Sequence, residues 1–273
     1  MIKGKSFHAG ASFNMEQKIT SFADLSTADV IGATVSAFED EVKNASFESK
    51  LSPTQHLDAI ATAKDSLVGL ARLHVMAQAP DYQPVMVEQP FRIELETCSH
   101  DLLGYIDMIG KDIEIEVYDV GDPLMIVDWK TTGRKPSQAT VDDSVQLTAY
   151  AASQFELATD GEMQVRLDVL VDGKHKTSRY KFDSQRDAFD VAALAHRVDM
   201  ISKAITTGVF PPAVPGAWWC SPGWCGYWNT CKYVNPKRRE RTKELAKVAD
   251  VIAKMEAPPE VPHRNDDTDV WVV

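Results

Sequence analysis

The spacing of apolar residues changes along the chain and separates helical from extended segments. In residues 26–47 and 52–79, apolar residues recur every three or four positions, as on one face of a helix. Ser26 and Ser52, at the start of these segments, are preferred N-cap residues. The pattern therefore predicts two helices in the first third of the chain.

From residue 85 onward apolar and polar residues alternate, which is typical of strands. The alternation predicts strands at 85–95, 103–109, 113–118 and 124–129. Turn signals at 110–111 and 121–123 separate the later three. Pro90 lacks a backbone donor, so it indicates an edge strand or a bulge in the first of them.

The pattern then becomes helical at 143–158 and extended at 165–171, where Asp172-Gly173 predicts a hairpin turn. A strand at 178–182 and a helix at 184–207, closed by Gly208, follow. Helices, strands, an inserted helix and further strands predict an α/β fold, with a central mixed β-sheet flanked by helices.

The C-terminal part has a different composition. Residues 216–233 are rich in Trp, Cys, Gly and Pro and show no period. Residues 236–256 form a charged segment that we expect to be helical. Residues 257–273 contain prolines and acidic residues, and we expect a flexible tail.

Composition limits the class of protein. The 44% of apolar residues includes no run long enough to span a bilayer, and no apolar segment follows the N-terminus, so we expect a cytoplasmic protein without a membrane partner. The net charge of −11 argues against a general nucleic-acid coat protein. It leaves open an enzyme that binds DNA through local basic patches.

Candidate chemistry lies at the ends of two predicted strands. Asp128 ends one apolar run and Asp107 lies within another. Lys130 is two residues after Asp128, so the side chains of Asp128 and Lys130 share a strand face. Two carboxylates and a lysine are what metal-assisted phosphodiester hydrolysis requires. In isolation, each of the two acids is equally typical of a strand-end turn.

Three further positions fit the same chemistry. Gln146 and Tyr150 are four residues apart in a predicted helix and share a face. His8, near the N-terminus, provides an imidazole that is a candidate metal ligand. Taken without its neighbours, Tyr150 is also a typical core residue.

These residues, in this order, resemble the PD-(D/E)xK nuclease superfamily, and within it the RecB-like exonuclease branch with its phage and CRISPR-associated members. The motifs that carry the resemblance are Gly4-x-x-x-His8, Gly104-x-x-Asp107, Asp128-Trp129-Lys130 and Gln146-x-x-x-Tyr150. The resemblance implies a restriction-endonuclease-like nuclease domain over residues 1–235. It also implies Mg²⁺- or Mn²⁺-dependent cleavage of DNA.

The resemblance implies roles for individual residues. His8, Asp107 and Asp128 correspond to metal ligands, and Lys130 to the residue that orients the attacking water. Gln146 and Tyr150 correspond to an accessory pair that contacts substrate or steadies the lysine. Glu88 is a weaker match to an acid of the family.

Basic residues are the candidates for DNA contacts. They lie after the third motif and in the charged C-terminal segment: Arg134, Lys135, Arg238, Arg239 and Arg241. The alternative for the C-terminal group is a solvated helix face.

The four cysteines argue against a disulfide scaffold in a cytoplasmic protein. Cys220, Cys225 and Cys231 resemble three ligands of the [4Fe-4S] cluster that many RecB-like nucleases hold. The fourth ligand of those relatives lies in a helix before the first motif, which implies that this helix is missing here. Zinc, or reduced thiols packed among tryptophans, are the alternatives, and Cys98 is expected to be a core or loop residue.

The sequence therefore predicts a metal-dependent deoxyribonuclease. The resemblance implies an exonuclease in phage recombination or repair, with DNA as substrate and a recombination or single-strand-binding protein as partner. The alternative is a catalytically inactive DNA- or protein-binding module on the same fold.

Overall fold

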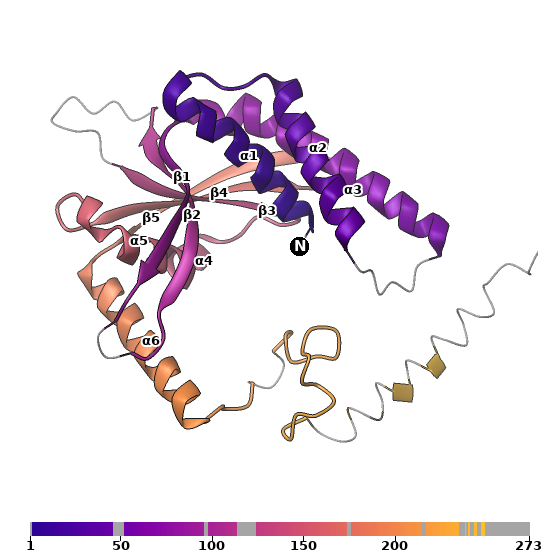
Figure 1. Ribbon diagram of the computed structural model, residues 1–273, viewed down its shortest axis with the longest axis vertical. Helices are drawn as coiled ribbons and strands as arrows, with labels where there is room; N and C mark the ends of the chain where they lie inside the picture. Colours follow the sequence, from indigo (N-terminus) through magenta and orange to yellow (C-terminus); the bar gives the residue numbers. More distant parts are fainter. Residues whose placement is uncertain are drawn as a thin grey trace, which may run out of the picture. The chain divides into compact units, whose positions relative to one another are not determined.

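The computed structural model describes residues 2–45, 52–95, 98–113, 124–173, 176–213 and 217–234, together with single positions from 238 to 248. The chain divides into two compact units, Met1–Val209 and Phe210–Val273. The first unit contains a five-stranded sheet with helices on both faces (Figure 1).

The strands of the sheet are neighbours in chain order. They are β1 Tyr82–Ile93, β2 Leu102–Asp112, β3 Met125–Thr132, β4 Met163–Asp172 and β5 Thr177–Arg186. β3 and β4 are parallel, and the other neighbouring pairs are antiparallel. This arrangement confirms the predicted mixed sheet.

Helices cover the two faces of the sheet. Three precede it: α1 Ile2–Ser21, α2 Thr27–Asn44 and α3 Pro53–Leu73. A π-helical turn at His74–Gln78 and a 3₁₀ turn at Ala79–Asp81 connect α3 to β1. The helices that follow are α4 Gln138–Asp142, α5 Val145–Ser153 and α6 Ala188–Thr207, with a 3₁₀ turn at Phe155–Leu157.

Alternation along β3 distributes the core between these faces. Val127 and Trp129 pack with residues of α1, α2 and α3, whereas Ile126 packs with residues of α4 and α5. Successive strand residues point to opposite faces, so one strand holds both halves of the core together.

Several helices begin or end at the capping residues that the sequence predicted. Ser26 caps α2 through its side chain, and Ser52 forms a capping box with Gln55 at the start of α3. Gly208 closes α6 with a left-handed φ of 70°. β1 lies at the edge of the sheet and carries a bulge between Pro84 and Met86, consistent with the prolines of this strand.

Three expected boundaries are wrong. β2 continues through Gly110, where a turn was expected. A Cβ there would lie 2.5 Å from the carbonyl oxygen of Gln83, so this glycine allows the close approach of two strands. The helix expected at 143–158 is shorter: the side chain of Ser144 caps α5, which ends at Ser153, and the 3₁₀ turn at Phe155–Leu157 follows. The helix expected from 184 begins later, because residues 184–186 still pair with β4 and Asp187 is the cap.

Several predictions fall outside the described residues. These are nearly all of the strand at 113–118, the turn at 121–123, most of the helix at 236–256, and the tail at 257–273. The described positions within 236–256 are helical. Among the described residues, no helix is both long and apolar enough to cross a bilayer.

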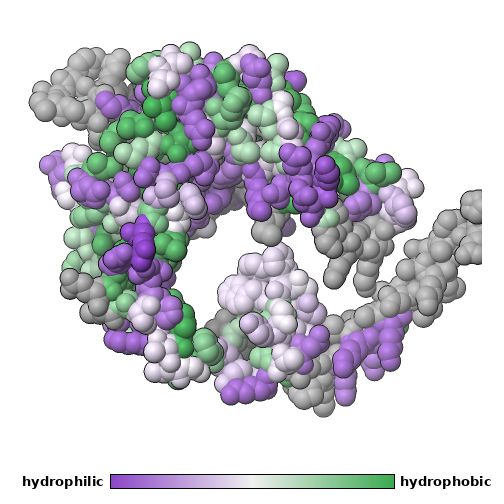
Figure 2. Space-filling model, viewed as in Figure 1, coloured by the Kyte–Doolittle hydropathy of each residue, from purple (hydrophilic) through white to green (hydrophobic). Residues whose placement is uncertain are grey.

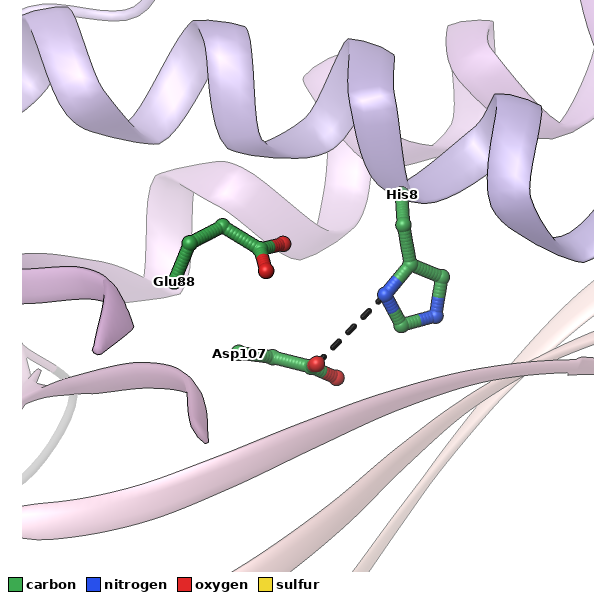
Figure 3. A group of neighbouring side chains, drawn as sticks. All are labelled: His8, Glu88 and Asp107. Carbon is green, nitrogen blue, oxygen red and sulfur yellow. Dashed lines mark ion pairs between the residues drawn. The ribbon is translucent and has the colours of Figure 1, made fainter. Parts of the chain in front are cut away.

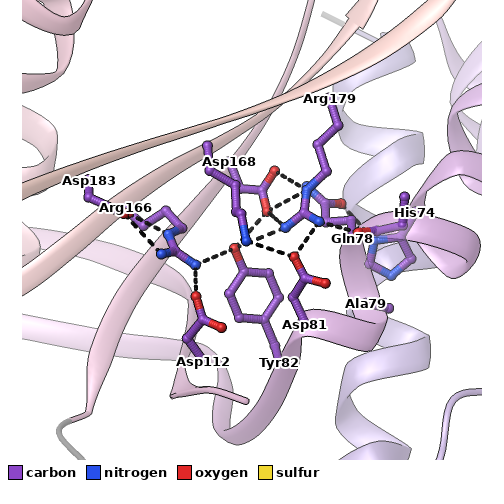
Figure 4. Close-up of polar contacts among 12 residues, drawn as sticks. His74, Gln78, Ala79, Asp81, Tyr82, Asp112, Arg166, Asp168, Arg179 and Asp183 are labelled. Atoms are coloured by element: carbon purple, nitrogen blue, oxygen red, sulfur yellow. Dashed lines mark hydrogen bonds and ion pairs between the residues drawn. The ribbon is translucent and has the colours of Figure 1, made fainter. Parts of the chain in front are cut away.

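A buried ionic network joins β1 to β4 and β5 (Figure 4). The hydroxyl of Tyr82 donates to Oδ2 of the fully buried Asp168 over 2.7 Å. The guanidinium groups of Arg166 and Arg179 each lie 5.7 Å from the centre of the Tyr82 ring. Arg179 pairs with Asp168 and Asp81, and Arg166 pairs with Asp112 and Asp183, so each arginine of the network faces two carboxylates.

Candidate active site

Asp107 and Asp128 lie where β2 and β3 stop pairing. The ladder between these strands covers only residues 108–110 and 125–127. Beyond it, the backbone N–H of Trp129 donates to Oδ2 of Asp107 over 2.7 Å. The two strands therefore separate at the carboxylates, and a side chain of β2 takes the place of a backbone acceptor.

His8 reaches Asp107 from helix α1. Its Nδ1 lies 3.5 Å from Oδ1 of Asp107 (Figure 3). The imidazole ring is packed edge-on against Phe7 and Trp129. Burial lowers the pKa of His8, but the Asp107 carboxylate outweighs burial and the net pKa is raised. Gly4 is one turn earlier, where a Cβ would make only ordinary contact with Thr131.

Glu88 completes a group of three. One ligand atom each from His8, Glu88 and Asp107 lie within 4.8 Å of one another, and in Figure 3 the three side chains converge. Glu88 also accepts a hydrogen bond of 2.6 Å from Ser12, one turn after His8 on α1. The position that was the weaker match in sequence thus lies within the group, and Asp128 lies beside it.

The backbone of Glu88 is strained. Its φ of 49° is in the left-handed region, which costs a residue with a side chain on the order of 1–3 kcal/mol. Such strain persists where the surrounding structure holds a residue in place, and it is concentrated at functional sites. Here it turns the carboxylate of an edge strand toward Asp107 and His8.

Asp128 is almost fully buried and pairs with Lys130. The lysine Nζ lies 3.0 Å from both carboxylate oxygens, although only Oδ1 receives a hydrogen bond of good geometry. Among the described residues, Oδ2 has no hydrogen-bond donor. Burial, and then the charge of Asp107, raise the pKa of Asp128 to about 6, against the opposing effect of Lys130.

Gln146 and Tyr150 line the site from helix α5. The Gln146 amide donates to the Tyr150 hydroxyl over 2.5 Å. Burial, followed by the charge of Asp128, raises the pKa of Tyr150, so its hydroxyl stays protonated. The ring of Phe91 packs edge-on against Tyr150 at 5.7 Å. This phenyl ring also lies over Gly104, where a Cβ would approach it to 2.6 Å.

The expected DNA contacts lie apart from one another in the chain. Arg134 and Lys135 are exposed in the loop after β3, and Nζ of Lys135 lies 4.5 Å from the centre of the Tyr180 ring. Arg238 belongs to the second unit and lies over the Trp228 ring. Arg239 and Arg241 are outside the described residues.

The cysteines do not form a complete set of ligands. Cys220, Cys225 and Cys231 are half-buried and line one cavity in the second unit. Their sulfur atoms are not all within 4.8 Å of one another, as tetrahedral zinc with its S···S distance of about 3.8 Å would require. Cys98 lies in the first unit beside Asp199. Three thiolates in the described part of the second unit are one fewer than a cubane cluster takes, so the donors do not fit that group.

Comparison with known proteins identifies a family. Residues 3–232 match the family model of the PD-(D/E)XK nuclease superfamily. No curated protein sequence matches the chain. The chain is similar to the crystal structure of SSO0001, with 12% sequence identity and a TM-score of 0.34, over 83% of this chain and 95% of that one. A likeness this distant carries no functional conclusion.

Proposed function

The chain belongs to the PD-(D/E)XK nuclease superfamily, and from this premise we propose that it is a divalent-metal-dependent deoxyribonuclease. We further propose that it is an exonuclease of the RecB-like branch, acting at DNA ends in phage recombination or repair. The observation that supports this most is the convergence of His8, Glu88 and Asp107 beside the Asp128–Lys130 pair.

The donors suit Mg²⁺ or Mn²⁺. Two carboxylates and one imidazole face one point, and hard divalent cations favour carboxylate oxygens. Asp128 lies beside this group, and its buried Oδ2 receives no hydrogen bond of good geometry, although the Lys130 ammonium lies 3.0 Å away. This oxygen can therefore accept a hydrogen bond from a water held by the cation. When bound, the cation lowers the pKa of water and stabilises the charge that develops on the phosphate.

The side chains of the protein supply the remaining steps. Lys130 is half exposed, so its ammonium group can donate to a water or a phosphate oxygen while Asp128 holds it in position. Tyr150 and Gln146 present a neutral hydroxyl and an amide, which donate hydrogen bonds to substrate. Arg134 and Lys135, on the exposed loop after β3, contact phosphates farther along the strand.

Cleavage of end-labelled linear DNA and of closed circular DNA tests this function. Wild-type protein with Mg²⁺ or Mn²⁺ should degrade linear DNA from its ends and leave circular DNA intact, and EDTA should stop the reaction. Asp107→Ala should abolish cleavage, whereas Asp40→Ala, at an exposed acid of α2, should not. DNA binding without cleavage under all these conditions would favour the inactive binding module.

A further inference from the structure

The second unit exposes an unusual number of aromatic rings. Five rings of residues 217–234 are more than half exposed: Trp218 (62%), Trp219 (52%), Trp224 (72%), Tyr227 (78%) and Tyr233 (53%). Singly exposed rings are common, but a group of five within one short segment marks an interaction surface. We call these five residues, with Lys232 and Arg238, the aromatic–basic surface.

Turns rather than regular elements arrange these rings. Trp218 lies edge-on to Trp219 at 5.5 Å and to Trp224 at 4.8 Å. Trp228 and Val234 of the same segment are buried, in contrast to these exposed rings. In Figure 2 this segment is mostly pale, because tryptophan, tyrosine and glycine have intermediate hydropathy. The large apolar side chains that are exposed in residues 217–234 are all aromatic.

The local charge of the aromatic–basic surface indicates which kind of partner it binds. The chain has a net charge of −11, yet no acidic residue occurs between Asp199 and Glu240. Within this interval, Nζ of Lys232 lies 5.0 Å from the centre of the Tyr233 ring, and Arg238 lies 5.7 Å from that of Trp228. This surface combines aromatic rings with neighbouring cations, and its stretch of sequence contains no acidic residue. It therefore complements a partner that has flat aromatic groups and regularly spaced negative charges.

A cavity of about 740 Å³ opens within the same surface. Its lining includes Trp219, Tyr227, Tyr233, Lys232 and Arg238. Sites for small aromatic ligands typically have volumes of about 300–1,000 Å³, so a nucleobase with its sugar can enter this one. The bases of a duplex are stacked on each other, and only an unpaired strand presents base faces to a protein.

We propose that the aromatic–basic surface binds single-stranded DNA, stacking bases on the exposed rings while Lys232 and Arg238 contact the phosphates. The choice of DNA rests on the proposed nuclease function. The stacking itself rests on the exposed rings, the cavity and the absence of acids. The surface thereby holds an unpaired strand of the substrate.

The proposal is tested by measuring, through fluorescence anisotropy in EDTA, how tightly the protein binds a labelled oligothymidylate of about 16 nucleotides. EDTA prevents cleavage, so binding is measured apart from catalysis. The double variant Trp224→Ala/Tyr227→Ala should bind about a hundredfold more weakly, because each ring contributes about tenfold, or about 1.4 kcal/mol. The variant Trp224→Phe/Tyr227→Phe should recover most of the affinity. Phe189→Ala, at a ring that is 87% exposed on α6, should bind like wild type.

Three results would overturn the proposal: no binding of the oligonucleotide, equal binding of a duplex of the same length, or tighter binding of the matching RNA. An unchanged affinity in the double alanine variant, with its fold verified by circular dichroism, would also contradict it. Failure of the nuclease proposal has a different outcome: no cleavage with Mg²⁺ or Mn²⁺, while binding in EDTA persists.

Discussion

The backbone N–H of Trp129 donates to the carboxylate of Asp107 at 2.7 Å, across the gap where β2 and β3 cease to pair. The indole of Trp129 is fully buried among residues of α1, α2 and α3. A core residue between Asp128 and Lys130 thus orients the acid on the neighbouring strand. The geometry of the site is therefore linked to the packing of the helices on one face of the sheet.

The first prediction concerns the pH dependence of stability without metal. The pKa of Asp128 is raised from 3.8 to about 6 in the folded protein. The folded state therefore holds this proton more tightly than the unfolded chain. The associated stability is present below pH 3.8 and is lost as the pH rises through 6.

Asp128→Asn removes this ionisation, and we expect it to stabilise the metal-free protein by about 1–3 kcal/mol at pH 8. At about pH 4.5 the gain should be smaller. Urea unfolding in EDTA at both pH values measures the difference. A gain that does not depend on pH would show that burial does not raise this pKa.

The second prediction separates the backbone of Glu88 from its carboxylate. Glu88→Gly and Glu88→Ala both remove the side chain, but only glycine adopts a φ of 49° without steric cost. The glycine variant should therefore be about 1 kcal/mol more stable than the alanine variant. Urea unfolding of the two proteins measures this difference. Equal stabilities would mean that Glu88 is not held in the left-handed region.

The third prediction explains the glycine of the Gly104-x-x-Asp107 motif. Gly104→Ala forces the Phe91 ring to move, since a Cβ would approach it to 2.6 Å. We expect a loss of about 1–3 kcal/mol in stability, as for other overpacked sites. The movement should also displace Tyr150, against which Phe91 packs. The second change Phe91→Leu should restore part of the stability in the double variant, and no restoration would argue against this contact.

The fourth prediction concerns phosphate contacts. Arg134 is exposed in the loop after β3. The slope of log K for DNA binding against log salt concentration reports how many ions are released. Arg134→Ala should reduce the magnitude of this slope by about one. Lys43→Ala, near the end of α2, is the control and should leave the slope unchanged. An unchanged slope for Arg134→Ala would exclude this residue from the interface.

Much of the fold could be predicted from the sequence, because amphipathic helices and alternating strands carry periodic patterns. Helix α1 was missed as an element. Its buried positions include Ser6, Ser12, Asn14 and Lys18, so no clear apolar stripe marks it. Lys18 is buried because it pairs with Asp24 and donates to the carbonyl of Ala79. Contacts that only the folded chain provides therefore stabilise this helix.

Some features of the candidate site could likewise be predicted from the sequence, and others depend on the folded structure. Motif order made Asp107, Asp128 and Lys130 the candidate site residues. The two-residue spacing in β3 already implied that Asp128 and Lys130 share a strand face, and the structure places them there. The position of Glu88 depends on the bulge in β1 and on a left-handed backbone, and neither leaves a mark in a pattern of apolar residues. The buried partners Arg166 and Asp168 were likewise not anticipated, because alternation along a strand does not reveal whether its polar face is covered.

Isothermal titration calorimetry with Mn²⁺ tests the central claim that His8, Glu88 and Asp107 hold a divalent cation. Wild-type protein should bind Mn²⁺ at this site, Asp107→Ala should abolish that binding, and Glu88→Gln should weaken it at least tenfold. Asp40→Ala should bind like wild type. Equal Mn²⁺ binding by all four proteins would contradict the account.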